Sequence, residues 1–126
     1  MRVLIIEDDT ELLSSLCEVF ERHGIFAEAA NSFSGAKSFI EKDPFDYVLV
    51  DLILGEDSGW DLIPLIQTQS HGPHPKIVIS SGNIDKKARD RADIWKFCDK
   101  PYNIAQLVNE IQSDQKETSA CSILNS

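Results

Sequence analysis

The stretch Tyr47–Asp51 limits the possible folds of this chain more than any other segment. Its first four residues are aromatic, β-branched or leucine, which is typical of a strand buried on both faces. Such strands belong to parallel sheets covered by helices on each side. Asp51 ends the run, and open parallel sheets collect ligands beyond the carboxyl ends of their strands. The segment therefore predicts an α/β fold with an acid at the functional edge of its sheet.

A second run of the same kind, Val3–Ile6, is followed by Glu7, Asp8 and Asp9. If the two strands are neighbours, three or four carboxylates converge and repel one another, so the arrangement needs a cation or a proton. A hard divalent ion, most simply Mg²⁺, suits such an all-oxygen site. Turns and helix caps would explain either acidic cluster alone. The metal-site interpretation therefore depends on the two clusters together.

Strands and helices alternate along the rest of the chain, which predicts a doubly wound five-stranded parallel sheet with right-handed crossovers and helices on both faces. Apolar residues at helical spacing alternate with short apolar runs. The predicted strands are residues 3–6, 25–30, 47–51, 76–81 and 95–99, and the predicted helices lie around Leu12–Phe20, Phe33–Ile40, Trp60–Ile66, Asn83–Ala92 and Ile104–Ile111.

Three of these segments have special features. Pro64 falls beyond the first turn of the third helix, so we expect a kink or an irregular start there. Residues 83–92 are charged and weakly periodic, which predicts a short, loosely held fourth helix. From Ser113 the chain is mostly polar, and we expect residues 113–126 to form a frayed tail beyond a domain of residues 1–112.

Composition limits the class of protein. A chain of 126 residues suits one domain, and its net charge of −9 argues against direct nucleic-acid binding, which needs clustered basic residues. Cys17, Cys98 and Cys121 cannot all pair and have no metal-ligand spacing, which indicates reduced thiols. The apolar run after Arg2 is too short for a signal peptide or a membrane span. We therefore expect a cytoplasmic protein without membrane contact.

Over about residues 2–112 the chain resembles the receiver domains of bacterial two-component response regulators, in the stand-alone, chemotaxis-type architecture. Four motifs carry the resemblance: Glu7-Asp8 after the first strand, Asp51 after the third, Ser80-Ser81-Gly82 after the fourth and Lys100-Pro101 after the fifth. The resemblance implies a flavodoxin-like receiver fold with strand order 2-1-3-4-5, which places the first and third strands side by side.

The resemblance also implies a role for each motif. Asp51 would be the phospho-acceptor, and Mg²⁺ would be held by Glu7, Asp8, Asp51 and the backbone carbonyl of Ile53, with Asp8 a direct ligand. The Lys100 ammonium would neutralise the phosphoryl oxygens. Such a site combines a carboxylate nucleophile with a metal and a fixed cation, as in-line phosphoryl transfer requires.

Three further positions complete the implied site. Ser81 would contact the phosphoryl group and act as a switch hydroxyl; we prefer it to Ser80 because a small residue, Gly82, follows it. Phe97 would be an aromatic residue that rotates inward on activation. The Lys100–Pro101 bond would be cis, turning the ammonium back over the site.

Two departures from the family pattern are visible. Gly55 stands where many relatives have proline, so we expect a looser loop there. The segment from Ser81 to Lys100 is also shorter than in typical relatives, which affects the fourth helix, part of the surface that relatives use for partners.

The sequence thus predicts a receiver that takes a phosphoryl group from a sensor histidine kinase or phosphotransfer protein onto Asp51 and signals by conformational change to a protein partner. A receiver fragment of a hybrid kinase or larger regulator remains an alternative. A haloacid-dehalogenase-type phosphatase is an alternative from another class, but it would need an acid two residues after the nucleophile, where this chain has Ile53. An interaction module that has lost phosphorylation is a third.

Overall fold

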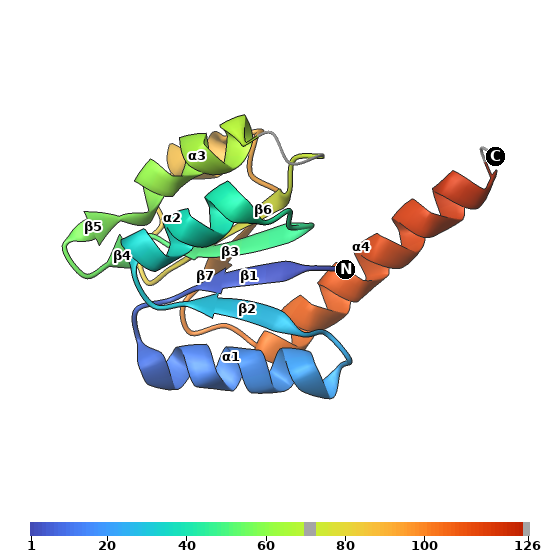
Figure 1. Ribbon diagram of the computed structural model, residues 1–126, viewed down its shortest axis with the longest axis horizontal. Helices are drawn as coiled ribbons and strands as arrows, with labels where there is room; N and C mark the ends of the chain where they lie inside the picture. The colour runs from blue at the N-terminus through green and yellow to red at the C-terminus, as the bar shows by residue number, and fades with distance from the viewer. Residues whose placement is uncertain (70–72, 125–126) are drawn as a thin grey trace.

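A five-stranded parallel sheet forms the centre of the molecule (Figure 1). The computed structural model describes residues 1–69 and 73–124, with side chains to residue 117. The strand order is β2-β1-β3-β6-β7, which confirms the predicted order because β6 and β7 are the fourth and fifth strands of this sheet. The strands are β1 (Val3–Ile6), β2 (Ala27–Ala30), β3 (Tyr47–Asp51), β6 (Lys76–Ser81) and β7 (Lys96–Asp99).

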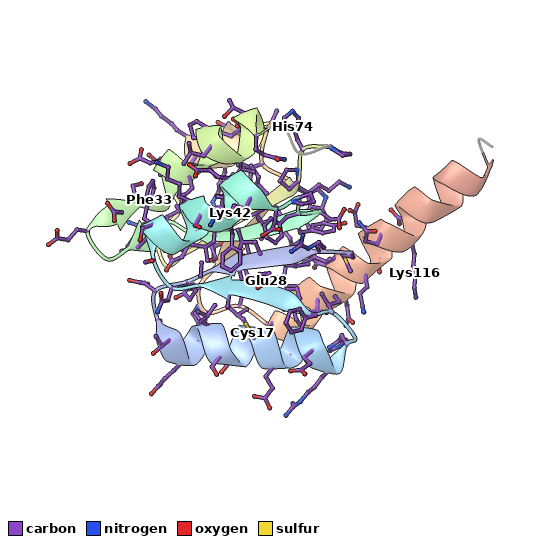
Figure 2. The ribbon with its side chains drawn as sticks, in the orientation of Figure 1. Cys17, Glu28, Phe33, Lys42, His74 and Lys116 are labelled. Atoms are coloured by element: carbon purple, nitrogen blue, oxygen red, sulfur yellow. The ribbon has the colours of Figure 1, made fainter. Side chains whose placement is uncertain are left out.

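Two helices cover each face of the sheet. On one face lie α2 (Phe33–Lys42) and α3 (Ile63–Thr68), and on the other lie α1 (Thr10–Arg22) and α4 (Ile104–Leu124), as Figure 1 shows. Each pair covers its own cluster of buried apolar residues. Figure 2 shows Cys17 on α1, where its side chain packs against the second of these cores.

Side-chain alternation along β3 places Asp51 on the face of the sheet that α1 and α4 cover. In β3, Val48 and Val50 belong to the core beneath α2 and α3, whereas Tyr47 and Leu49 belong to the core beneath α1 and α4. Since successive side chains point to opposite faces, Asp51 continues the row of Tyr47 and Leu49. The acid is therefore buried at the top of that row, with 3% of its surface exposed.

Side chains cap the starts of three helices. The Asp9 carboxylate accepts hydrogen bonds from the backbone N–H groups of Glu11 and Leu12, at 3.1 and 3.2 Å, at the start of α1. Ser32 caps α2 in the same way, and Asn103 Oδ1 accepts from Gln106 N at 2.9 Å at the start of α4. These side chains satisfy backbone donors that have no partner within the helix.

The expected irregular start of the third helix is confirmed. A 3₁₀ turn, Gly59–Leu62, precedes α3, and Pro64 then lies in the first turn of the α-helix proper. Proline is tolerated there because the N–H groups of the first turn have no partner within the helix.

The loop after β3 has regular structure. It forms a small hairpin of β4 (Ile53–Leu54) and β5 (Asp57–Ser58), with Gly55 at φ +63° in the turn. Glycine adopts this left-handed conformation without a steric penalty. The Gly55 N–H also donates to Asp8 Oδ2 at 3.0 Å, which ties the hairpin to the acidic cluster. The expectation that this loop is looser than in relatives with proline stays a prediction.

The predicted fourth helix is also wrong. Between β6 and β7 the described chain has only a three-residue 3₁₀ turn, Ala88–Asp90, because Ile84 and Ile94 alone are buried along this segment and no apolar stripe can hold a helix on the sheet. The segment is held by side chains instead. The Arg91 guanidinium lies 4.9 Å from the centre of the Trp60 ring, and Gln67 donates to Asp93 at 2.6 Å.

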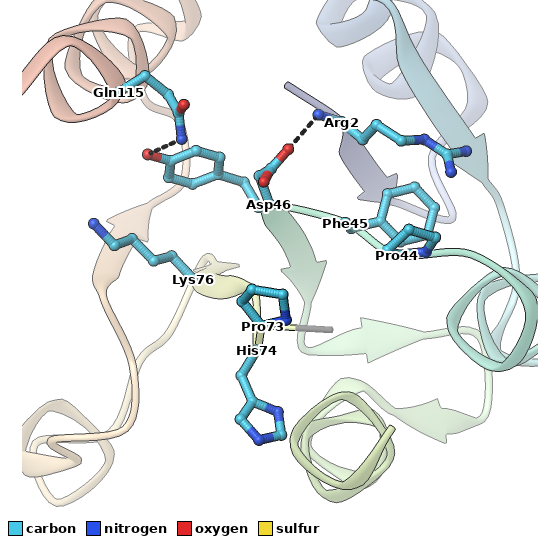
Figure 3. Close-up of a pocket in the computed structure, with 9 residues that line it drawn as sticks. Arg2, Pro44, Phe45, Asp46, Pro73, His74, Lys76 and Gln115 are labelled. Atoms are coloured by element: carbon cyan, nitrogen blue, oxygen red, sulfur yellow. Dashed lines mark hydrogen bonds between the residues drawn. The ribbon is translucent and has the colours of Figure 1, made fainter. Parts of the chain in front are cut away.

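The last helix is longer than predicted, since α4 continues past Ser113 to Leu124. Asp114 accepts hydrogen bonds from the Tyr47 hydroxyl and, at 2.6 Å, from Lys76 Nζ. Gln115 Nε2 also donates to the Tyr47 hydroxyl at 3.3 Å, beside a pocket of about 330 Å³ (Figure 3). Residues 113–124 of the expected frayed tail are therefore helical and tied to the sheet at their start, whereas residues 125–126 lie outside the described part of the chain. The domain boundary at residue 112 stays a prediction.

Cys17 and Cys98 are free thiols, whereas the Cys121 side chain lies outside the described residues. In the part of the chain that the structure describes, no helix combines the length and apolar character needed to cross a membrane.

Candidate functional site

Three carboxylates converge at the carboxyl edge of the sheet, as the sequence predicted. Glu7, Asp8 and Asp51 each offer an oxygen, and these oxygens lie within 4.8 Å of one another. The parallel pairing of β1 with β3, in which Ile6 is opposite Val50, brings the two strand ends together. Glu7 and Asp51 are buried, with 2% and 3% of their surface exposed, whereas Asp8 is open to solvent.

Lys100 brings a cation to the two buried acids. Its Nζ lies 3.0 and 2.9 Å from the two oxygens of Glu7 and 3.3 Å from Asp51 Oδ2. The Lys100 N–H donates to the Ser81 carbonyl at 2.8 Å, which fixes the backbone beside β6. The Lys100–Pro101 peptide bond is cis, as expected.

One lysine does not balance the site. Burial raises the pKa of Glu7 to about 7, the hydrogen bond from Lys100 opposes the shift, and the charge of Asp51 adds to it. Burial works to lower the pKa of Lys100, but its contacts with Glu7 and Asp51 raise the pKa above its ordinary value. Three carboxylates therefore lie beside one ammonium group, and the negative charge that Lys100 does not balance favours binding of a second cation.

The donor set fits a hard divalent cation. Every ligand atom in the cluster is a carboxylate oxygen, and exposed Asp8 leaves a side open to water, as Mg²⁺ sites require. Asp51 Oδ1 accepts a hydrogen bond from the Ile53 N–H at 3.1 Å, which fixes the carboxylate plane. The Ile53 side chain is 64% exposed beside this site, and the metal-binding role of its carbonyl stays a prediction.

Gly59 is a positioning residue that the sequence analysis missed. A Cβ atom at this position would lie 2.1 Å from the Asp51 carbonyl oxygen, so only glycine permits this approach. The Gly59 N–H also donates to the Leu52 carbonyl at 2.9 Å. The hairpin therefore folds back onto the backbone of Asp51. The only signal in the sequence was a glycine near the end of a turn.

The two candidate hydroxyls lie on opposite sides of β6. Ser80 is paired with Asp51 of the neighbouring strand β3. Ser81 lies on the other face with Ile79, whose neighbour in β7 is Phe97, a partly buried residue that packs on the core beneath α2 and α3. The Ser81 hydroxyl accepts a hydrogen bond from the Asn83 N–H at 3.2 Å. The assignment of Ser81 and Phe97 as switch residues stays a prediction.

Comparison with known proteins identifies the family. Residues 3–112 match the model of the response regulator receiver domain. The alginate biosynthesis transcriptional regulatory protein AlgB of Pseudomonas putida is 30% identical over 84 residues, which cover 67% of this chain and 19% of that protein. The response regulator receiver protein CpdR of Brucella abortus is 27% identical over 117 residues, covering 88% of this chain and 93% of that protein.

A solved structure is similar over nearly the whole chain. It is a response regulator protein from Burkholderia pseudomallei with a phosphorylated aspartic acid, calcium ion and citrate. Its TM-score is 0.76 and its sequence identity 27%, and the match covers 99% of this chain and 74% of that one.

These matches differ in how much of each relative they cover. The chain spans only about a fifth of AlgB, so the activities of whole regulators do not transfer with the match. None of these comparisons supports the phosphatase alternative. Since the family model covers most of the sequence, this chain belongs to the receiver domains of response regulators, the signalling modules of two-component systems.

Proposed function

We propose that Asp51 accepts a phosphoryl group from a phosphohistidine of a sensor histidine kinase or phosphotransfer protein. The observation that carries this proposal is the position of Lys100, whose ammonium lies between the buried carboxylates of Asp51 and Glu7, with exposed Asp8 beside them. A carboxylate nucleophile beside a fixed cation is the arrangement that phosphoryl transfer needs.

The transfer step uses groups of this chain directly. An Asp51 oxygen forms the new P–O bond while the P–N bond to the donor histidine breaks, and the imidazole keeps the electron pair and is protonated from solvent. The Ile53 N–H fixes the orientation of Asp51 through Oδ1. Lys100 neutralises charge on the transferred group, because it already lies on the Oδ2 side of the acceptor.

The same residues would hold Mg²⁺. Glu7, Asp8 and Asp51 supply carboxylate oxygens, and the Ile53 carbonyl is the fourth proposed ligand. When bound, the ion supplies positive charge that offsets the negative charge of the phosphoryl oxygens. The similar Burkholderia protein contains a phosphorylated aspartate together with a calcium ion, which supports an oxygen-ligand metal site of this kind.

The output of the domain is conformational. Phosphorylation adds negative oxygens at Asp51, and we expect Lys100, which already lies 3.3 Å from Asp51 Oδ2, and Ser81 to move toward them. Because Ser81 and Phe97 share one face of the sheet, movement of Ser81 opens space that Phe97 can fill. We expect the protein partner to bind a surface formed by the segment between β6 and β7, by β7 itself and by the start of α4.

We propose that the domain works in one of two protein architectures. The chain acts alone, as its 93% coverage of CpdR suggests, or as the receiver of a hybrid kinase or larger regulator, as its partial coverage of AlgB suggests. The net charge of −9 argues against direct contact of this chain with nucleic acid, and we propose a cytoplasmic location.

Labelling by acetyl phosphate tests the proposal. With Mg²⁺ present, a receiver takes up one phosphoryl group per chain and releases it slowly by its own catalysis. A haloacid-dehalogenase-type phosphatase would instead turn over many equivalents, and an inert interaction module would stay unlabelled. A panel of histidine kinases then identifies the physiological donor as the one that labels the chain fastest.

A further inference from the structure

Arg91, in the segment between β6 and β7, lies against the aromatic ring of Trp60. Its Cζ atom lies 4.9 Å from the centre of the ring, within the range of a cation–π contact. The guanidinium is held in this position by Asp93, to which it donates two hydrogen bonds, at 3.0 and 2.6 Å. Asp93 in turn accepts a hydrogen bond from Gln67 of α3 at 2.6 Å. The segment is therefore fastened to the helical unit that consists of the 3₁₀ turn Gly59–Leu62 and α3.

The same helical unit touches the acceptor at its first residue. A Cβ atom on Gly59 would lie 2.1 Å from the Asp51 carbonyl oxygen and 2.9 Å from Leu52 Cα. The Gly59 N–H also donates to the Leu52 carbonyl at 2.9 Å, so the two pieces of backbone are both packed and bonded together. Tightly packed protein interiors have low compressibility and transmit displacements. A shift of the backbone at Asp51 therefore moves Gly59, and Trp60 is the next residue.

The segment that receives this displacement has little regular structure. It contains one 3₁₀ turn, Ala88–Asp90, and of its apolar side chains Ile84 and Ile94 are buried. Ile94 belongs to the core beneath α2 and α3. An element held by few contacts opens locally at a small cost in free energy, so each contact has a large influence on its position. The stack of Arg91 on Trp60 is a contact of this kind.

We propose that Arg91 is a positioning residue that couples the segment between β6 and β7 to the acceptor through Trp60. This inference rests on the proposed phosphorylation of Asp51. Phosphorylation shifts the backbone of the acceptor, Gly59 follows because it has no free space, and the Trp60 ring carries the stacked guanidinium with it.

This route differs from the one through Ser81 and Phe97 in the part of the chain that it reaches. Ser81 ends β6 and Phe97 lies in β7, so these residues act on the two ends of the connection. Arg91 follows the 3₁₀ turn within the connection. The two routes therefore predict separate effects, one on residues 88–94 and the other on residues 81–83 and 97–103.

Arg91→Met tests the coupling because it keeps an unbranched side chain and removes the charge and the guanidinium plane. The N–H groups of Asp90, Arg91 and Ile94 donate to carbonyls three residues earlier, at 3.2, 3.2 and 3.4 Å, so their exchange reports the order of the segment. In the wild type we expect beryllofluoride with Mg²⁺ to slow exchange over residues 88–94. In the variant this slowing should be roughly two- to fivefold smaller, the effect of one cation–π contact at a partly exposed site. Residues 81–83 and 97–103 should respond as in the wild type.

Arg89→Met is the matched control. It removes the same charge from the same segment, but Arg89 pairs with Asp99 of β7 and not with Trp60. Exchange over residues 88–94 should therefore slow on adding beryllofluoride as it does in the wild type. Equal losses of the response in the two variants would mean that charge or general loosening governs the segment, and would overturn the role of the stack.

Tryptophan emission gives a readout independent of exchange and of labelling. The chain has two tryptophans, so the background Trp95→Phe leaves Trp60 as the only one. We expect beryllofluoride with Mg²⁺ to change the Trp60 emission beyond the effect of Mg²⁺ alone. Arg91→Met in this background should keep that change, because the displacement reaches Trp60 through Gly59 and not through Arg91.

Three results would overturn the inference while the proposed function stands. They are unchanged Trp60 emission on adding beryllofluoride, wild-type exchange that does not slow over residues 88–94, and full slowing over these residues in Arg91→Met. Labelling by acetyl phosphate separates this case from failure of the proposed function. A wild type that takes up one phosphoryl group keeps the proposed function, and one that takes up none overturns both.

Discussion

Gly59 packs directly against the backbone of Asp51, so close that a Cβ atom on Gly59 would lie 2.1 Å from the Asp51 carbonyl oxygen. This carbonyl is part of the backbone, so it cannot move aside as a flexible side chain would. The position of the acceptor thus depends on a residue eight positions later in the sequence, in the turn that begins the third helical segment.

Gly59→Ala should therefore displace the backbone at Asp51. We expect a loss of about 1–3 kcal/mol in the free energy of unfolding, typical of overpacking in a tight site. Labelling by acetyl phosphate should also slow, because the acceptor no longer lies in line with Lys100. Urea denaturation and the labelling rate measure the two effects.

Gly82→Ala is the control for stability. No atom lies within 4 Å of a Cβ built at Gly82, so its free energy of unfolding should change little. If the two alanine variants were equally stable, the close packing of Gly59 on Asp51 would have no energetic importance.

The raised pKa of Glu7 predicts a pH dependence of stability. Because the folded protein binds the Glu7 proton more tightly than the unfolded chain, Glu7 contributes stability below its ordinary pKa of 4.5, and this contribution is lost as the pH rises through about 7. With a chelator present to remove metal ions, the contribution of Glu7 to the wild-type free energy of unfolding should therefore fall as the pH rises between these two values.

Glu7→Gln removes the titrating group and should flatten that component. The comparison needs urea titrations of both proteins at several pH values in the same ionic strength. If the wild type and the variant show parallel curves across this window, the folded protein does not hold the Glu7 proton as burial implies.

The sequence predicted the parts of the fold that depend on local patterns. Apolar runs located the five strands, and apolar residues at helical spacing located α1, α2, α3 and α4. The acidic cluster was also predictable, since the order of parallel strands brings Glu7 and Asp51 together once both follow buried strands.

The remaining features depend on long-range contacts. Gly59 matters because a Cβ atom there would meet the Asp51 carbonyl oxygen, and this relation has no sequence pattern. The helix expected at residues 83–92 is replaced by a segment held through Arg91 and Trp60. The extension of α4 likewise depends on Asp114, which reaches a tyrosine 67 positions earlier.

The segment after β6 should respond most to phosphorylation. It has only one short 3₁₀ turn and a few side-chain contacts, so a small change in free energy can shift its conformations. Amide exchange with beryllofluoride and Mg²⁺ should slow over residues 81–103 and change little over residues 12–40. Uniform protection, or none, would place the output surface elsewhere.

The central claim is that Asp51 carries the phosphoryl group. The most direct test compares acetyl phosphate labelling of the wild type with that of Asp51→Asn, and locates the label by mass spectrometry of peptides. The amide is nearly isosteric and removes a charge from a crowded acidic site, so the variant should fold with an equal or higher melting temperature. We predict one phosphoryl group per wild-type chain, on the peptide that contains Asp51, and none on the variant. Label on the folded variant at the wild-type level would contradict the assignment.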